Sequence, residues 1–289
     1  MKTFFVVNPA AGKKRAFSIW ERLRASIDFP HEFALTQGPG QATEIAREAV
    51  RAGYDKVVAI GGDGTIREVV QALAQTEACL GVIPAGTGND FGRSLGIPPE
   101  PRGALEIIKG GYVRRVDLLR SGQNFFANVV GAGLDAEVVD AVNRGPKVMT
   151  GTITYVVQLL RVLAGYSTSE VTLEIDGRTV KRKAWLVAVS NARFFGGGMM
   201  ICPDALVDDG LLDVCIVNEI SKAELLRFLP TVFSGKHKSH PAFEVLKGKR
   251  VRMEFAPPAK VQADGDIIDF TPMEFSVEPG ALRVLAGQV

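Results

Sequence analysis

Two short glycine-rich segments contain the residue types that could bind phosphate. The first is Gly61-Gly62-Asp63-Gly64-Thr65, which follows the apolar residues 56–60, and the second is Pro84-Ala85-Gly86-Thr87-Gly88-Asn89-Asp90, which follows residues 80–83. Glycine allows a backbone to turn sharply and to approach a ligand closely. The free N–H groups at the start of a following helix attract phosphate oxygens. Together the two segments predict a nucleotide site, with the phosphates held by backbone.

An aspartate in the first segment adds a second kind of chemistry. Asp63 could orient a magnesium ion or the water around it. The alternative is a tight turn that binds nothing. Neither segment has the Gly-x-Gly-x-x-Gly spacing of a dinucleotide site, and no Gly-Lys-Ser or Gly-Lys-Thr of a P-loop occurs in the chain.

The elements that must position these segments alternate between two periods. Short apolar runs predict buried strands, and apolar residues at i, i+3 and i+4 predict helices. The predicted strands are 4–7, 31–36, 56–60 and 80–83, and the predicted helices are 17–27, 41–52 and 66–73. This order predicts an α/β fold, a parallel sheet with helices on both faces. Such sheets bind ligands at the carboxyl ends of their strands.

The pattern changes after about residue 122. Predicted strands follow one another with turn residues between them, including Asp176-Gly177 and Asp264-Gly265. They are 124–130, 170–175, 183–190, 212–217, 250–255 and 274–277, with helices near 134–142 and 152–163. We expect a mainly antiparallel β-sandwich or barrel. The predicted domains are 1–122 and 123–277, with residues 278–289 returning to the first.

Composition excludes several classes of protein. A net charge of +2 is too small to indicate nucleic acid as the main partner. No run of about 20 apolar residues predicts a transmembrane helix. The three cysteines, Cys79, Cys202 and Cys215, are widely spaced, so we expect no disulfide framework and no cysteine zinc site. His237 and His240 are expected in a surface loop rather than at a metal. These features favour a cytoplasmic protein.

The chain resembles the diacylglycerol kinase-like lipid kinases, in the soluble bacterial branch that is related to the sphingosine kinases. Five segments carry the resemblance, in the family's order and over essentially the whole length. They are Asn8-Pro9-Ala10-Ala11-Gly12-Lys13, the two glycine-rich segments, residues 196–213 with Gly196-Gly197-Gly198 and Asp209-Gly210, and Gln262-Ala263-Asp264-Gly265-Asp266. The Gly-Gly-Asp-Gly segment alone also occurs in NAD kinases and phosphofructokinases, whose fold the resemblance implies for the first domain.

The resemblance implies a kinase that uses ATP and Mg²⁺ to phosphorylate the free hydroxyl of a lipid at the membrane surface, most simply diacylglycerol. The residues that would line the ATP site are Asn8, Thr36, Gly61, Gly62, Asp63, Gly64, Thr65, Gly86, Thr87 and Asn89. Asp63, Asp90 and Asp117 would position magnesium through water. Asp213 matches a segment that holds a structural metal in some members, and its alternative is an acidic turn. Family members can also form homodimers.

The general base is where this chain departs from the family. Members usually carry Asp-Gly-Glu near the C-terminus, and here the segment reads Asp264-Gly265-Asp266. Asp266 is shorter by one methylene but can still accept a proton from the acceptor hydroxyl. A kinase for a soluble acceptor such as NAD, and a catalytically silent regulator that binds nucleotide or lipid, are the two alternatives. Apolar residues of the second domain, with helix 152–163, would hold the acyl chain, although a helix of this kind is more often part of the core.

Overall fold

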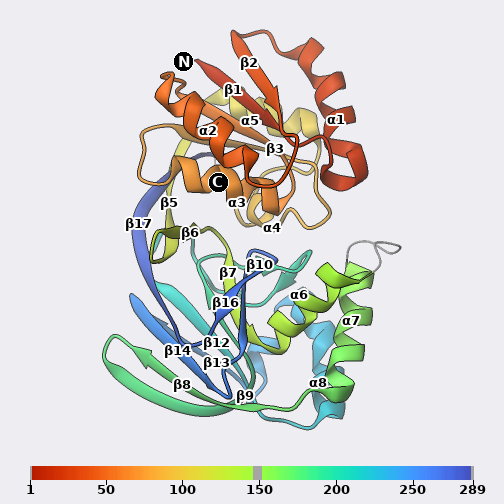
Figure 1. Ribbon diagram of the computed structural model, residues 1–289, viewed down its shortest axis with the longest axis vertical. Helices are drawn as coiled ribbons and strands as arrows, with labels where there is room; N and C mark the ends of the chain where they lie inside the picture. Colours follow the sequence, from red (N-terminus) through yellow and green to blue (C-terminus); the bar gives the residue numbers. More distant parts are fainter. Residues whose placement is uncertain (1, 146–151, 288–289) are drawn as a thin grey trace. The chain divides into compact units, whose positions relative to one another are not determined.

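The computed structural model describes residues 2–145 and 152–287, and these residues divide into two compact units. Unit 1 consists of residues 1–118 and 279–289, and unit 2 of residues 119–278. Two strands, β5 (Val113–Ser121) and β17 (Met273–Leu285), belong to both units along their length. Figure 1 shows β17 in blue as one long strand.

Unit 1 is built on a parallel sheet. Its strand order is β17, β4 (Cys79–Pro84), β3 (Lys56–Gly61), β1 (Thr3–Val7) and β2 (His31–Leu35), and each neighbouring pair is parallel. Every residue of β3 and β4 is buried. Buried parallel strands need apolar side chains on both faces, which explains the unbroken apolar runs in the sequence. The predicted fold class of this region is confirmed.

Four main helices cover this sheet in two pairs. Helix α2 (Gln41–Arg51) contacts α3 (Asp63–Leu73), and α1 (Ala11–Leu23) contacts α5 (Pro101–Gly110). Helix α4 (Asp90–Ser94) is a short turn after β4. The expected helix over 17–27 is wrong at both ends, because α1 starts at Ala11 and a 3₁₀ turn, η1 (Arg24–Ser26), follows it. Residues 12–14 have positive φ angles of 57–72° and are not in a regular helical conformation. No helical pattern of apolar residues is therefore expected there.

Unit 2 is mainly antiparallel and has two apolar cores. Strand β9 (Arg178–Ser190) pairs with β8 (Ser169–Ile175) along its first half, and with β7 (Val129–Gly133) and β12 (Leu212–Asn218) along its second. The remaining strands are β6 (Asn124–Phe126), β10 (Phe194–Phe195), β11 (Met199–Met200), β13 (Phe243–Gly248), β14 (Arg250–Ala256), β15 (Lys260–Ala263) and β16 (Asp266–Phe270). The predicted β-sandwich class is confirmed.

Helices line the second core of unit 2. They are α6 (Leu134–Arg144), α7 (Thr152–Gly165) and α8 (Lys222–Phe228), followed by the 3₁₀ turns η2 (Leu229–Ser234) and η3 (Lys236–Ser239). Helices α6 and α7 contact each other, as the green helices of Figure 1 show. Side chains from all three helices meet those of β9 and β12 in one apolar cluster. None of the helices among residues 2–145 and 152–287 is long and apolar enough to cross a membrane.

Two expectations about unusual residues are corrected by unit 2. Cys202 and Cys215 form a disulfide with Cα atoms 6.3 Å apart, because the loop before β12 returns to that strand. His237 is not in a surface loop but buried in η3, where its ring lies 4.5 Å from that of Phe243. The two cysteines are 13 residues apart in the chain, and the His237 ring also contacts the carbonyl of Ile201, 36 residues away, so local pattern does not reveal either arrangement.

Candidate active site

The two glycine-rich turns of unit 1 lie against each other at the carboxyl ends of β3 and β4. The amide of Ala85 donates to the carbonyl of Gly61 at 2.8 Å. A Cβ atom placed on Gly86 would lie 2.5 Å from Cα of Gly62, which is closer than Cβ atoms come to other atoms. Glycine is therefore required here by the approach of two backbones. The structure brings these two sequence-predicted turns together.

Hydrogen bonds fix the shape of each turn. Asn8, at the end of β1, donates from Nδ2 to Oγ1 of Thr65 at 2.9 Å, so the first turn is tied to a neighbouring strand. In the second turn, Oδ1 of Asn89 accepts from the amide of Gly86 at 2.9 Å, and its Nδ2 donates back to the Gly86 carbonyl at 3.1 Å. Asn89 adopts a left-handed conformation with φ of 53°. These contacts hold Thr87 and Gly88 in a closed loop.

Thr36, the remaining predicted nucleotide residue, follows β2, and Gly12, from the segment Asn8–Lys13, follows β1. Thr36 is buried after β2, and its amide donates to Val7 at the end of β1 at 2.9 Å. A Cβ atom added to Gly12, the second residue of α1, would overlap the carbonyl oxygen of Ala85, so no side chain fits there. The turn after β1 therefore also contacts the second glycine-rich segment.

Three aspartates of unit 1 come from three different parts of its sheet: two follow strands β3 and β4, and one lies within β5. Asp63 begins α3, and its Oδ1 accepts from the amide of Phe91 at 3.3 Å, which couples the first turn to α4. Asp90 begins α4 and is buried. Asp117 is buried on β5, where Oδ1 accepts from the amide of Gly280 at 2.7 Å. Strand β17 separates β5 from β4 in the sheet.

The predicted role of these three aspartates is to position magnesium through water, not to bind it directly. Within residues 2–145 and 152–287, no three His, Cys, Asp or Glu side chains are arranged to hold a metal ion directly. The oxygens of Asp63 and Asp90 suit a hydrated Mg²⁺, which keeps several of its waters and uses few protein ligands. Direct chelation by a protein cage is therefore not the arrangement that these residues support.

Asp213 lies in a different chemical environment from the one expected of a metal ligand. It is 2% exposed on β12, and Nζ of Lys247 on the paired strand β13 lies 3.4 Å from its Oδ1. The same ammonium contacts Asp209 at 3.2 Å. Burial raises the pKa of Asp213, and Lys247 opposes that shift. Lys247 thus supplies positive charge beside the Asp213 carboxylate. The Oδ2 atom of Asp213 is buried without a hydrogen bond.

In unit 2 the candidate base is carried by a hairpin between β15 and β16. Asp266 begins β16 opposite Ala263 and is half-buried. Asp264, with φ of 47°, accepts hydrogen bonds from the amides of Ala127, Asn128 and Val129 at 3.2–3.3 Å. Three backbone donors to one carboxylate hold the tip of the hairpin on the segment before β7. Asp264 therefore ties down the hairpin that carries Asp266.

A buried polar group missed by sequence reasoning lies below this hairpin. Gln262 is fully buried; its Oε1 accepts from Gly265 at 3.3 Å, and its Nε2 donates to Oδ2 of Asp135 at 3.2 Å. Burial raises the pKa of Asp135 to about 7. The other carboxylate oxygen of Asp135 is buried without a hydrogen bond. Helix α6 also carries Glu137 and Asp140, so no local signal singles out Asp135.

Asp135 also lines an apolar pocket in unit 2. Its walls come from α6, α7, α8, η2 and the sheet, and include Tyr155, Leu159, Leu163, Met199, Leu225, Leu226, Val232 and His237. The free space is about 70 Å³, so a larger ligand has to displace flexible side chains at its rim. Tyr155 is partly buried against this apolar cluster, and desolvation, followed by the charge of Asp135, raises its pKa. The pocket offers apolar surface with three polar groups, the Asp135 carboxyl, the Tyr155 hydroxyl and the His237 ring.

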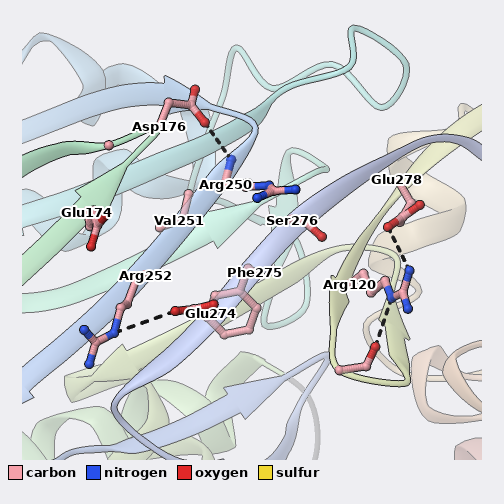
Figure 2. Close-up of a pocket in the computed structure, with 12 residues that line it drawn as sticks. Arg120, Glu174, Asp176, Arg250, Val251, Arg252, Glu274, Phe275, Ser276 and Glu278 are labelled. Atoms are coloured by element: carbon pink, nitrogen blue, oxygen red, sulfur yellow. Dashed lines mark hydrogen bonds and ion pairs between the residues drawn. The ribbon is translucent and has the colours of Figure 1, made fainter.

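A second concavity in unit 2 is larger, about 670 Å³, but differs in character (Figure 2). It lies on the charged outer face of β8, β14 and β17, and none of the predicted site residues lines it. Its ions are matched: Arg120 pairs with Glu278 at 3.2 Å, and Arg252 contacts Glu254 at 3.1 Å. Matched charges on a solvated sheet face are ordinary surface. We therefore place the candidate functional residues of unit 1 at the glycine-rich turns, and those of unit 2 at the hairpin and the apolar pocket.

Comparison with known proteins agrees with this geometry. Residues 2–121 match the family described as the diacylglycerol kinase catalytic domain, and residues 128–286 match the YegS C-terminal NAD kinase beta sandwich-like domain. The "Diacylglycerol kinase" of Mycobacterium tuberculosis is 36% identical over 84% of this chain and 81% of its own length. A "Probable lipid kinase YegS-like" of Pseudomonas aeruginosa is 34% identical over 91% of this chain and 89% of its own.

Solved structures share the fold over nearly the whole chain. The crystal structure of a diacylglycerol kinase from Bacillus anthracis str. Sterne has a TM-score of 0.76 at 24% identity, and covers 99% of this chain and 97% of that one. At this identity the likeness shows the fold. The family matches and the relatives above 30% identity carry the assignment: the chain belongs to the diacylglycerol kinase family of lipid kinases.

Proposed function

We propose that the protein transfers the γ-phosphoryl group of ATP to the free hydroxyl of a lipid, diacylglycerol or a related molecule, in the presence of Mg²⁺. Unit 1 would bind the nucleotide and unit 2 the lipid. The observation that carries the choice of acceptor is the apolar pocket of unit 2, whose lining is aliphatic and aromatic apart from Asp135 and His237. Such a pocket suits a hydrocarbon chain and does not suit a charged, sugar-bearing acceptor such as NAD.

The nucleotide half of the proposal rests on the paired turns. Backbone N–H groups at the start of α3 can hold phosphate oxygens without any basic side chain. Asp63 and Asp90 would hold a hydrated Mg²⁺, and Asp117 would complete this acidic set. When it is bound with the nucleotide, Mg²⁺ neutralises charge on the phosphates. Phosphoryl transfer depends mostly on such positioning and charge neutralisation.

In unit 2 the proposed base is Asp266, and Asp264 is its positioning residue. Asp266 would accept the proton of the acceptor hydroxyl as that oxygen attacks phosphorus. The rigid hold on the hairpin supports this role, since three amides fix Asp264. Asp135 offers its unpaired oxygen to a polar group of the acceptor at the pocket. The membrane is then the source of the acceptor.

Labelled ATP tests the proposal directly. The protein is incubated with γ-labelled ATP and Mg²⁺, and dispersed diacylglycerol and NAD are offered in separate reactions. We expect label in the organic phase with diacylglycerol and none on NAD. Label on NAD would contradict the choice of acceptor. Bound ATP with no transfer to any lipid in a cell-derived extract would identify a silent binding protein instead.

A further inference from the structure

The residue before the proposed base, Gly265, has both of its backbone polar groups bonded by side chains. Its amide donates to Oε1 of Gln262 at 3.3 Å, and its carbonyl accepts from Nδ2 of Asn143 on α6 at 3.1 Å. The carbonyl of Gly265 and the nitrogen of Asp266 belong to one planar peptide unit. Gln262 and Asn143 therefore fix the backbone from which the side chain of Asp266 branches.

Gln262 faces α6 rather than the core that its neighbours enter. Val261 and Ala263 are fully buried in the apolar core between the strands of unit 2. Side chains alternate along a strand, so Gln262 lies on the opposite face of β15, where α6 packs. It is fully buried, and a buried amide costs stability unless it is hydrogen-bonded. Its two ends are bonded to Gly265 and to Oδ2 of Asp135.

A glycine makes room for the contact between Gln262 and Asp135. Gly131 on β7 is the register partner of Gln262 on β15. A Cβ atom added to Gly131 would overlap Oδ2 of Asp135 and would lie 2.9 Å from Nε2 of Gln262. The carboxyl of Asp135 thus occupies the space that a side chain on β7 would fill. Two strands and one helix are built around this hydrogen bond.

The amide of Gly265 determines which way the Gln262 side chain is turned. A backbone N–H can only donate, so the oxygen of Gln262 has to face Gly265 and its NH₂ group has to face Asp135. Oδ2 of Asp135 must then accept, and a proton on this carboxyl must be held by Oδ1. Ionisation of Asp135 strengthens the bond from Gln262, because a charged acceptor binds a donor more tightly. Neighbouring hydrogen bonds polarise one another, so the change reaches Gly265.

We propose that Gln262 is a positioning residue, which joins Asp135 in the pocket wall to the hairpin of the proposed base. Asp135, Gln262 and Gly265 form one hydrogen-bonded unit, which we call the Asp135 relay. The inference rests on the proposed function, because that function gives the relay its role in placing Asp266. An acceptor lipid that hydrogen-bonds to Asp135 changes the charge on Oδ2, and Gln262 carries this change to the hairpin.

Other ionisable groups lie near Asp135, whose own pKa is raised to about 7 by burial. Burial raises the pKa of Tyr155 and brings that of Tyr166 to about 12, so neither tyrosine ionises near neutral pH. Burial lowers the pKa of the His237 imidazole in the pocket wall. The remaining groups lie on α6 and on the hairpin packed against it, and are Glu137, Asp140, Lys260 and Asp266. Asp135→Asn therefore identifies which titration belongs to Asp135.

The amide signal of Gly265 tests the relay without depending on catalysis. Labelling the full chain with ¹⁵N-glycine and ¹³C-carbonyl aspartate selects the glycines that follow an aspartate, which are Gly64, Gly177, Gly210 and Gly265. The Gly265 signal is the one that Asp264→Asn removes. We expect its chemical shift to titrate near pH 7 in the wild type, whereas Gly64 and Gly177 serve as controls. The titration should vanish in Asp135→Asn and in Gln262→Met. A Gly265 signal that does not titrate, or that titrates equally in Asp135→Asn, would overturn the relay.

Exchanging the donor and the acceptor tests the positioning role. Gln262→Met has a side chain of similar length without hydrogen bonds, so we expect kcat for diacylglycerol to fall about 10–100-fold with KM for ATP unchanged. When Asp135→Asn is present, Gln262→Glu restores both bonds, because the new carboxylate accepts from Gly265 and from the new amide. This double variant should keep the kcat of Asp135→Asn alone, and Asp135→Asn with Gln262→Met should not. Equal losses in the two double variants would overturn the proposal.

A further variant breaks the relay while retaining both of its polar side chains. Gly131→Ala displaces the Asp135 carboxyl, so kcat should fall by a factor similar to that of Gln262→Met. The matched controls are Gly165→Ala, which has nothing within 4 Å of its added Cβ, and Gln123→Met, an exposed amide of the same unit. Both controls should keep the wild-type kcat and unfolding temperature. A normal kcat in Gly131→Ala with a displaced Gly265 signal would overturn the positioning role.

The two readouts also separate the possible failures. A Gly265 signal that follows Asp135 in a protein that labels no lipid would contradict the proposed function alone. Labelled diacylglycerol with a normal kcat in Gln262→Met would contradict the positioning role alone.

Discussion

The glycine-rich turns of unit 1 and the hairpin of unit 2 are positioned by different parts of the polypeptide. In unit 1 the two turns contact each other through their backbones, and Gly86 lies against Cα of Gly62. In unit 2 the contacts run through side chains, from Asp264 to three amides and from the buried Gln262 to the buried Asp135. The glycine-rich turns have no room for an added atom, whereas the hairpin depends on each of its polar groups. Substitutions should therefore fail in opposite ways in the two units.

Removing the proposed base should have the largest effect. Asp266→Asn keeps the size of the side chain but cannot accept a proton, so we expect kcat for lipid phosphorylation to fall about 10²–10⁴-fold. Nucleotide affinity should not change. The matched control is Asp269→Asn, an exposed acid on the same strand β16. Steady-state kinetics with ATP binding measured separately checks this, and a normal kcat in Asp266→Asn would remove Asp266 from the mechanism.

Asp135 should make the stability of unit 2 depend on pH. Its pKa is raised by burial from 3.8 to about 7, so the folded chain retains a proton that the unfolded chain loses. Stability from this group is full below about 4 and is lost as the pH rises through about 7. The loss amounts to up to about 4 kcal/mol. Asp135→Asn cannot ionise, so it should be more stable than the wild type at pH 8.

Denaturant unfolding at several pH values measures this difference. The advantage of Asp135→Asn should shrink as the pH is lowered toward about 4, where the wild-type carboxyl is protonated in both states. Asp269→Asn again serves as the control, because it changes the same groups on an exposed strand end. A stability difference that stays constant with pH would show that Asp135 is not a buried acid of raised pKa.

Adding one methyl group to the turn of unit 1 should have an intermediate effect. Gly86→Ala forces two backbone segments apart, because its Cβ would lie 2.5 Å from Cα of Gly62. Overpacking of this kind costs about 1–3 kcal/mol, and we expect ATP affinity to fall by a comparable factor of about 10–100. Gly110→Ala is the control, since nothing lies within 4 Å of its added Cβ. Titration calorimetry with ATP gives the result, and equal affinity in both variants would contradict the close approach.

The smallest expected effect concerns the positioning residue Asp264. Asp264→Asn retains one oxygen acceptor but loses the charge that strengthens its hydrogen bonds to Ala127, Asn128 and Val129. We expect a loss of about 1 kcal/mol in stability and a modest fall in kcat with KM for ATP unchanged. Asp264→Ala should lower both further. If kcat were unaffected in both variants, the hairpin would not need Asp264 to place Asp266.

The contrast also explains what could be predicted from sequence. Gly61–Thr65 and Gly86–Asn89 could be recognised because a turn that admits only glycine leaves a local signature after an apolar strand. The parallel and antiparallel classes followed from strand and helix periods in the same way. Asp135 could not be identified, because its significance comes from Gln262, which is 127 residues away in the chain. The Cys202–Cys215 bond and the burial of His237 likewise depend on tertiary contacts.

The ends of an element were predicted least well where one long strand pairs with different neighbouring strands along its length. The expected strand 274–277 is the start of β17, which pairs with β14 at Met273–Ser276 and with β4 at Arg283 and Val284. Its middle contains Pro279 and Gly280, which usually end strands. The amide of Gly280 instead donates a hydrogen bond to the carboxylate of Asp117. That side-chain contact has no counterpart in a local pattern.

The central claim is that the acceptor is the free hydroxyl of a lipid. The most direct test offers diacylglycerol beside triacylglycerol, in which that hydroxyl is acylated, with labelled ATP and Mg²⁺. We predict a labelled phosphate ester from diacylglycerol, identified by mass spectrometry at the formerly free hydroxyl, and none from triacylglycerol. Equal labelling of both lipids, or of neither while ATP is bound, would contradict the account.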